Sequence, residues 1–316
     1  MTGHRIDVHH HILPPEYVAV VGDARIGPLI VAGRTPTWSA ELSIEAMERN
    51  GIATAITSIS APGLWFGDRQ STRNLCRHCN EFAATIGRDH PGRFGMFASL
   101  PLPDVEDSLK EIEYALDTLG AEGIGLLTSY GNQYPGDPAF APVFDELNRR
   151  GAVVYFHPTA AACSQCLPEI PAATLEFPFD TTRAIVSLLY SGTFARCPNI
   201  RFIFSHAGGT VPFLAERIAR LAARPEFKQH IPNGAIPELK RLFYDTALSA
   251  NAFTFAALLK LVAAEHVLFG SDYPFAPEAT MTATVKGLQE LGLAAEALRG
   301  IERDNALALF PTLKTV

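Results

Sequence analysis

Three consecutive histidines near the N-terminus, His9, His10 and His11, are the first residues in the chain whose type and spacing could do chemistry. They end a short run that begins at Arg5 and has the apolar pattern of a β-strand. Because successive side chains on a strand point to opposite faces, His9 and His11 share one face and His10 points to the other. Two imidazoles placed in this way can bind one metal ion. Metal binding is therefore favoured over a chance cluster or a tag remnant, since the histidines lie inside a strand pattern.

Three further polar residues, His157, His206 and Asp272, stand at an equivalent place along the chain. Each directly follows a run that is typical of a buried strand, namely Val153–Phe156, Phe202–Ser205 and Val267–Ser271. Any one of them alone would be explained as well by a buried core histidine or by a helix-capping aspartate. Their recurrence at the ends of several strands instead indicates a shared site.

The elements that must position these residues alternate along the whole chain. Eight short β-rich runs are each followed by a loop and a helical pattern: Arg5–His9, Thr54–Ile59, Arg93–Ser99, Gly123–Thr128, Ala152–His157, Arg201–His206, Leu242–Thr246 and Val267–Ser271. This alternation predicts an α/β fold, and eight βα units predict a closed TIM-type (β/α)₈ barrel. Catalytic residues of such barrels come from the C-terminal ends of several strands, so this fold would bring the polar residues to one mouth.

The length of 316 residues and the hydrophobic content of 47% suit one large domain, which we expect to span residues 1–316. Two stretches, Gly22 to Ala40 and Thr159 to Asp180, lack a clean period. We expect both to be irregular insertions, the first of them over the C-terminal mouth of the barrel.

Charge and composition limit the classes of partner. The formal net charge is −7 and the basic residues are dispersed, which argues against binding to nucleic acid or to an anionic membrane and favours a small molecule. No apolar run approaches the roughly 20 residues of a membrane span, and the first residues lack a secretory pattern, so a cytoplasmic protein is expected.

Five cysteines fit reduced thiols better than a disulfide framework. Cys76 and Cys79 are too far from Cys163 and Cys166 for a compact zinc ribbon, and the role of the second pair stays open.

Several motifs resemble those of the amidohydrolase superfamily, and within it the aminocarboxymuconate-semialdehyde decarboxylase-like family (amidohydrolase family 2). The resemblance runs nearly from end to end. Its motifs are Ile6–Pro14, Phe156–Pro158, Ser191–Phe194, Ser205–Gly209, Gly270–Phe275 and Asn305.

The resemblance implies that His9, His11, His157 and Asp272 bind a metal ion and that His206 transfers protons to or from the substrate. Imidazoles with one carboxylate independently suit Zn²⁺, with Mn²⁺ as the alternative. Two-metal members of the superfamily usually carry a Lys or Glu at the end of the fourth strand, whereas Gly123–Thr128 has neither, so a single divalent ion is expected. The resemblance also implies a homodimer.

The resemblance further implies decarboxylation of a small aromatic acid of the o-hydroxybenzoate type, such as 6-methylsalicylate, or of a related unsaturated carboxylic acid. Either Asp272 or His206 would protonate the ring carbon. Relatives that act on the muconate semialdehyde carry an arginine for substrate carboxylate where this chain has Ser43, which argues against that substrate. Aromatic residues near the expected mouth could line the pocket around a planar substrate. The candidates are Trp38, Trp65, Phe66, Phe177, Phe179 and Phe275, of which we prefer Trp65, Phe179 and Phe275.

Other functions remain open from the sequence. The same ligands would serve a metal-dependent hydrolase that opens a lactone or an amide, with Asp272 as general base. Hydration of an unsaturated acid is a third possibility. A barrel that only stores or senses metal is the non-enzyme alternative, which is disfavoured because open metal sites at barrel mouths are usually catalytic.

Overall fold

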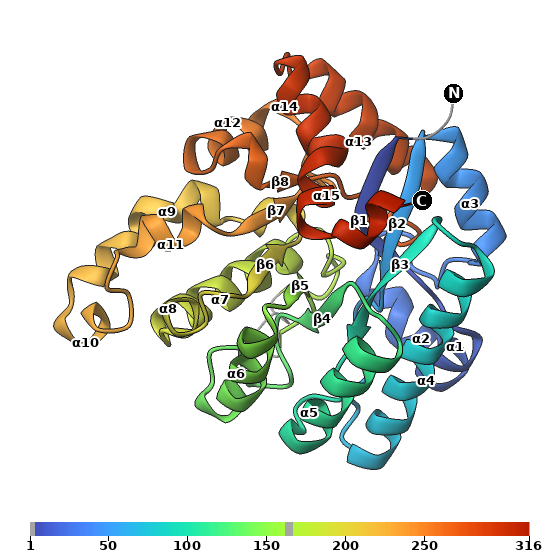
Figure 1. Ribbon diagram of the computed structural model, residues 1–316, viewed down its shortest axis with the longest axis horizontal. Coiled ribbons are helices and arrows are strands. Elements are labelled where there is room, and N and C mark those ends of the chain that lie inside the picture. The colour runs from blue at the N-terminus through green and yellow to red at the C-terminus, as the bar shows by residue number, and fades with distance from the viewer. Residues whose placement is uncertain (1–3, 162–166, 316) are drawn as a thin grey trace.

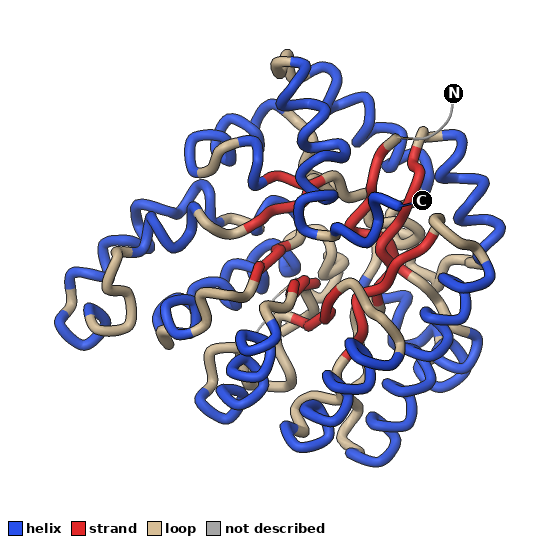
Figure 2. The backbone as a smooth tube through the Cα atoms, viewed as in Figure 1, coloured by secondary structure: helices blue, strands red, loops and turns tan. Residues whose placement is uncertain are grey.

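The computed structural model describes residues 4–161 and 167–315, and its centre is a parallel eight-stranded sheet in the order β1 to β8 (Figures 1 and 2). The strands are β1 (Arg5–His11), β2 (Ile52–Ser58), β3 (Phe94–Ser99), β4 (Gly123–Leu127), β5 (Val153–His157), β6 (Arg201–Phe204), β7 (Phe243–Asp245) and β8 (Val267–Leu268). The sheet curls until β1 meets the segment after β8. Val8 N–H donates to Phe269 O at 3.0 Å and Asp272 N–H donates to His9 O at 2.8 Å. The predicted TIM-type barrel is therefore confirmed.

Helices surround the strands on the outside of the barrel (Figure 2). They are α1 (Pro15–Val21), α2 (Asp23–Ile26), α3 (Ala40–Arg49), α4 (Arg69–Asp89), α5 (Val105–Glu113), α6 (Ala141–Arg150), α7 (Glu176–Tyr190), α8 (Thr193–Arg196), α9 (Val211–Ala219), α10 (Pro225–Lys228), α11 (Ala235–Lys240), α12 (Ala252–Leu261), α13 (Glu278–Glu290), α14 (Ala295–Arg299) and α15 (Asn305–Leu309). Side-chain caps fix where several of them begin. Ser39, Asp68 and Asp104 each accept a backbone N–H from the first turn, of α3, α4 and α5 respectively.

The barrel interior is filled with side chains and forms a floor beneath the mouth. Alternate residues of each strand point inward, and Phe97 of β3 stacks on Tyr155 of β5 with ring centroids 5.1 Å apart. Leu309 and Phe310 pack against this inner cluster from the C-terminal end of the chain. Because Tyr155 and His157 are two residues apart, the same alternation that buries Tyr155 in the floor places His157 in the layer above it.

All eight predicted strands are present, with ends that differ by a few residues. The two irregular segments are only partly confirmed. The first contains α2 and a short 3₁₀ turn at Gly27–Leu29, and it reaches the mouth as expected. The second was extended too far, because α7 already begins at Glu176. Pro178 is compatible with this helix start, because a proline in the first turn removes no helical hydrogen bond.

Within residues 4–161 and 167–315, each helix is too short or too polar to cross a lipid bilayer.

Candidate metal centre and active site

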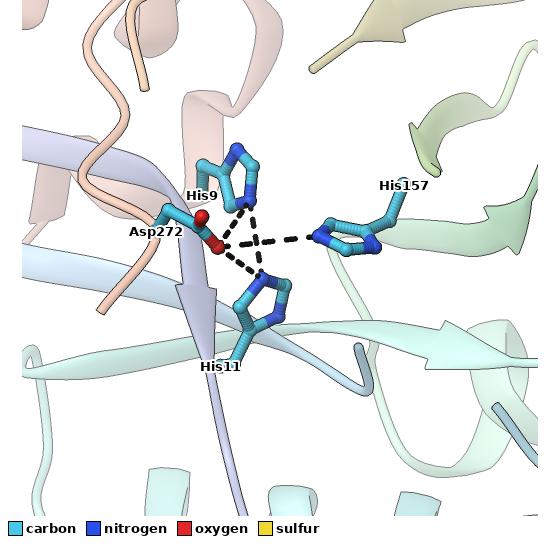
Figure 3. Close-up of side chains that lie close together, drawn as sticks. All are labelled: His9, His11, His157 and Asp272. Atoms are coloured by element: carbon cyan, nitrogen blue, oxygen red, sulfur yellow. Dashed lines mark hydrogen bonds and ion pairs between the residues drawn. The ribbon is translucent and has the colours of Figure 1, made fainter. Parts of the chain in front are cut away.

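The four predicted metal ligands meet at the C-terminal mouth of the barrel (Figure 3). His9 Nε2 and His11 Nε2 lie 3.1 Å apart, and each is 3.1 Å from Asp272 Oδ1. His157 Nε2 lies 4.0 Å from the same carboxylate oxygen. One donor atom from each of the four side chains falls within 4.8 Å of the others, and all four side chains are buried. The structure thus brings together every residue that the sequence predicted for the metal.

The alternation of β1 determines which histidines face the site. His9 and His11 point into the barrel, whereas His10 points away and lies 3.0 Å from Asp7 and 3.2 Å from Ser43. Ser43 is fully buried beside His10 and does not line the cavity at the mouth. The position that carries an arginine in the muconate-semialdehyde enzymes is therefore a packing position in this chain.

Asp272 reaches the ligands because the backbone after β8 turns sharply. Its φ is 65°, a left-handed conformation that aspartate tolerates better than most residues. The backbone bond to His9 O fixes this turn against β1. The carboxylate of Asp7 accepts hydrogen bonds from Ser271 N and Ser271 Oγ. These bonds hold Ser271, the residue before Asp272, in place.

Electrostatics within the cluster are dominated by burial and by the carboxylates. Burial lowers the pKa of His11 and lowers that of His157 well below its usual value, so both rings are neutral at pH 7. Burial also opposes protonation of His9, but Asp245 and Asp272 outweigh it and raise the pKa of His9 to about 10. Burial alone would raise the pKa of Asp272, yet His9 and the other histidines hold it well below its ordinary range.

This donor set suits a divalent metal ion. Three imidazole nitrogens and one carboxylate oxygen converge in a buried space, where lone pairs facing one another are costly unless a cation lies between them. Three histidines with one carboxylate match the nitrogen and oxygen donors that zinc and similar ions prefer. Such a centre opens on one side to the cavity at the mouth, because His157 and Asp272 also line that cavity.

The pKa of His9 makes metal binding dependent on pH. Below about pH 10 His9 holds a proton that a metal ion must displace, whereas His11, His157 and Asp272 have none to release near pH 7. We expect the ligands to release one proton per Zn²⁺ bound near pH 6, and affinity to rise about tenfold per pH unit while His9 remains protonated. Calorimetry in buffers of different ionisation enthalpy measures this release. Binding at pH 6 that releases no proton would contradict the assignment of His9.

An apolar cavity of about 720 Å³, part of it open to solvent, lies directly above the four ligands. Besides His157 and Asp272 its walls are Ile30, Val31, Ser60, Ala61, Ala173, Phe177, Leu248, Phe275, Ala276, Pro277 and Thr280. The described lining contains no lysine or arginine.

The three aromatic residues predicted to bind substrate occupy different places. Phe275 lines the cavity and packs its ring edge-on against His11, with centroids 5.4 Å apart. Trp65 instead lines a separate small cavity near the ends of β3 and β4. Phe179 lies on α7 with 39% of its side chain exposed and is not part of the cavity lining. Phe177, two residues earlier, does line the cavity.

His206 lies beside the four candidate metal ligands and is not one of them. Its Nε2 is 3.5 Å from Asp272 Oδ2, and its ring centroid is 4.9 Å from that of His9. The residue is only 8% exposed, and its Nδ1 has no hydrogen-bond partner among the described residues. A buried histidine with an unused nitrogen next to a metal site is suited to transfer a proton to or from a bound molecule.

Asp245 and Leu248 are among the residues of this site that were missed from the sequence. Asp245 ends β7 and lies 2.7 Å from His9 Nδ1, and Leu248 lines the cavity three residues later with a left-handed φ of 54°. Asp245 carries the same indication that identified the others, a polar residue at the end of a strand. Nothing in the sequence around Leu248 indicates its place in the cavity.

The cysteines show no metal site in the described part of the chain. Cys76 and Cys79 are buried in α4, where Cys76 Sγ donates to Ser99 O. Burial raises the pKa of Cys79 to about 12 and that of Cys76 well above its usual value, which disfavours the thiolate that a metal requires. Cys163 and Cys166 lie outside the described residues.

Comparison with known proteins agrees with this architecture. The amidohydrolase family model matches residues 6–312. The 6-methylsalicylic acid decarboxylase of Penicillium expansum is 39% identical over 318 residues, which cover 99% of this chain and 98% of that protein. A crystal structure of an amidohydrolase II has a TM-score of 0.90 and 30% identity, covering 97% of this chain and 99% of the other. A dihydroxybenzoic acid decarboxylase from a Polaromonas species, solved with manganese and 2-nitroresorcinol, has a TM-score of 0.83 and 22% identity, covering 98% and 97%. The chain belongs to the amidohydrolase family.

Proposed function

We propose that this protein is a metal-dependent decarboxylase of small aromatic acids that carry a hydroxyl group next to the carboxylate, such as 6-methylsalicylate. The observation that carries the proposal is the cavity, which combines a floor of metal-binding side chains with apolar walls. The relative from Penicillium expansum, a decarboxylase of that acid, supports it.

The walls of the cavity favour a flat, weakly polar ring. Phe177 and Phe275 offer aromatic surface, and Leu248 and Ile30 add aliphatic surface. Since the described walls contain no lysine or arginine, the substrate carboxylate has no cationic partner there other than the metal centre. This arrangement favours an acid with a single carboxylate at the metal and apolar substituents elsewhere, and disfavours a dicarboxylate.

The residues divide the chemistry between binding and proton transfer. His9, His11, His157 and Asp272 would hold the metal ion, which when bound attracts the carboxylate and hydroxyl oxygens of the acid and offsets their charge. His206 would donate a proton to the ring carbon that bears the carboxylate. The carbon–carbon bond then breaks, its electrons restore the aromatic ring, and CO₂ leaves.

His206 is a better proton donor than Asp272 in this arrangement. As one of the four metal-facing residues, Asp272 would have to be ionised to hold the metal ion, so it has no proton to give. Asp272 Oδ1 also faces the ring nitrogens of the other ligands. Asp272 Oδ2, 3.5 Å from His206 Nε2, would instead orient the ring of the donor.

Zn²⁺ is the ion that we propose, with Mn²⁺ as the alternative. Three imidazoles and one carboxylate suit zinc, whereas manganese prefers a larger share of oxygen ligands. The Polaromonas decarboxylase, which shares the fold, was solved with manganese. Metal analysis of the purified protein should give about one ion per chain.

Incubation with 6-methylsalicylate in D₂O tests the reaction. We expect CO₂ and an aromatic product with one deuterium at the carbon that lost the carboxylate, because the new C–H bond takes its proton from an exchangeable group. Mass spectrometry and NMR measure both. If no o-hydroxybenzoate loses CO₂ while lactones or amides are opened, the protein is a hydrolase and the proposal is wrong.

We also propose a homodimer. Phe213 on α9 and Phe253 on α12 are 85% and 92% exposed, and α9 and α12 contact each other. Large aromatic side chains are enriched at subunit interfaces and are costly to leave in water. Light scattering at micromolar concentration should give about twice the 34.2 kDa mass of one chain. A mass that stays at one chain across the concentration range would contradict the dimer.

A further inference from the structure

Asp245 is a buried carboxylate that contacts two functional histidines but is not one of the four metal-facing residues. It ends β7 and is fully buried. Its Oδ2 accepts a hydrogen bond from His9 Nδ1 at 2.7 Å. Its Oδ1 accepts from the backbone N–H of His206 at 2.9 Å and of Ala247 at 3.0 Å. A single side chain therefore joins a metal-facing histidine to the backbone of the candidate proton donor.

The bond to His9 selects the tautomer that can bind a metal ion. An ionised carboxylate only accepts hydrogen bonds, so His9 Nδ1 must carry the hydrogen. When a metal ion displaces the second proton of the ring, the lone pair left free is on Nε2, the atom that lies 3.1 Å from both His11 Nε2 and Asp272 Oδ1, while Nδ1 points away from the other ligands (Figure 3). Gly270 permits this close pairing, since a Cβ there would lie 2.8 Å from His9 Cβ and 3.1 Å from Asp245 Cβ.

The bond to His206 anchors an unusual stretch of backbone. His206 and Ala207 have φ values of 53° and 55°, and Gly208 and Gly209 follow with 73° and 63°. Residues with a side chain rarely adopt this left-handed region, so the first of four such residues needs an external restraint. Asp245 Oδ1 supplies it at the His206 amide and thereby fixes the position from which the ring reaches Asp272.

We propose that Asp245 is a positioning residue that orients the metal ligand His9 and the proton donor His206 with its two carboxylate oxygens. It touches neither the reacting carbon nor the metal ion and acts only through the two histidines. The part of the proposal that concerns His206 rests on the proposed function, whereas the part that concerns His9 does not.

The substitution Asp245→Asn tests the proposal with little change in shape. The amide oxygen can still accept the backbone N–H groups, but the amide nitrogen then presents a donor to the donor His9 Nδ1–H. We expect Zn²⁺ affinity, measured by competition with a chromophoric chelator, to fall about 10- to 100-fold. With Zn²⁺ saturating, we expect kcat for decarboxylation to fall while KM changes little, because the substrate contacts remain.

Glu111→Gln is the matched control. Glu111 is another buried carboxylate, bonded to Arg77 and Asn80 far from the metal centre. The control should lower the melting temperature without changing Zn²⁺ affinity. Zn²⁺ affinity equal to that of the unmodified protein in folded Asp245→Asn would overturn the proposal. Weakened Zn²⁺ binding supports it even if the unmodified protein decarboxylates nothing, which separates this inference from the proposed function.

A second measurement covers the case in which Asp245→Asn does not fold. The unmodified protein, labelled with ¹⁵N-histidine and loaded with Zn²⁺, should show His9 with a protonated Nδ1 and a metal-bound Nε2 in its NMR spectrum. The Nδ1 proton should exchange slowly because it is buried against Asp245. Metal bound through Nδ1, or a rapidly exchanging proton there, would overturn the proposal.

Discussion

Replacing His206 with Asn should reduce the decarboxylation turnover at least about 100-fold while the metal ion stays bound. His206 is not among the four ligands, so its loss removes the proton donor and leaves the donor atoms of the centre in place. General acid catalysis typically contributes about 10²–10⁴-fold, and a hundredfold loss corresponds to about 2.7 kcal/mol of transition-state stabilisation. Turnover within tenfold of the unmodified enzyme would remove His206 from the mechanism.

Asparagine is the appropriate substitute because of the backbone at this position. The φ of 53° at His206 is left-handed, and asparagine adopts that region more readily than most residues. The substitution therefore removes the imidazole without adding backbone strain. His78→Asn, at an exposed position on α4 that pairs with Glu16, should leave turnover unchanged and serves as the control. Asp272→Asn should differ from both by weakening metal binding and lowering turnover together.

The double substitution His9→Ala/His11→Ala should abolish metal binding and all activity that depends on it. These two rings supply half of the donor atoms in the cluster, and both lie 3.1 Å from Asp272 Oδ1. A centre left with one imidazole and one carboxylate cannot satisfy a tetrahedral ion. Metal content measured on the purified variant should fall from about one ion per chain to near zero.

His10 provides the control within the same strand. Its ring points away from the centre and bonds to Asp7 and Ser43, so His10→Asn should keep its metal. Loss of these buried bonds should lower the free energy of unfolding by about 1–3 kcal/mol, which thermal unfolding measures. If the double variant retains a full metal complement, or if His10→Asn loses its metal as completely as the double variant does, the ligand assignment on β1 is wrong.

The barrel and the polar residues that converge at its mouth could be predicted from sequence patterns. Strand alternation separates His9 and His11 from His10, and this local rule holds whatever the rest of the chain does. The positions of His157 and Asp272 after buried strands were equally readable, because the ends of parallel strands in a barrel converge on one mouth. Periodicity and strand ends are local properties, and they grouped these residues with His206; the family resemblance then implied that His206 is not one of the metal ligands.

The side chains that line the cavity, and those that support the metal-facing residues, could be identified only from the packing of separate elements. Phe177 and Phe179 are two residues apart on α7, yet only Phe177 lines the cavity, because the way the helix packs determines which side chain faces the mouth. Asp245 lies 236 positions along the chain from its partner His9, so no local pattern links them. Such contacts depend on the exact approach of separate elements, as at Gly270, where one added Cβ would push Asp245 and His9 apart.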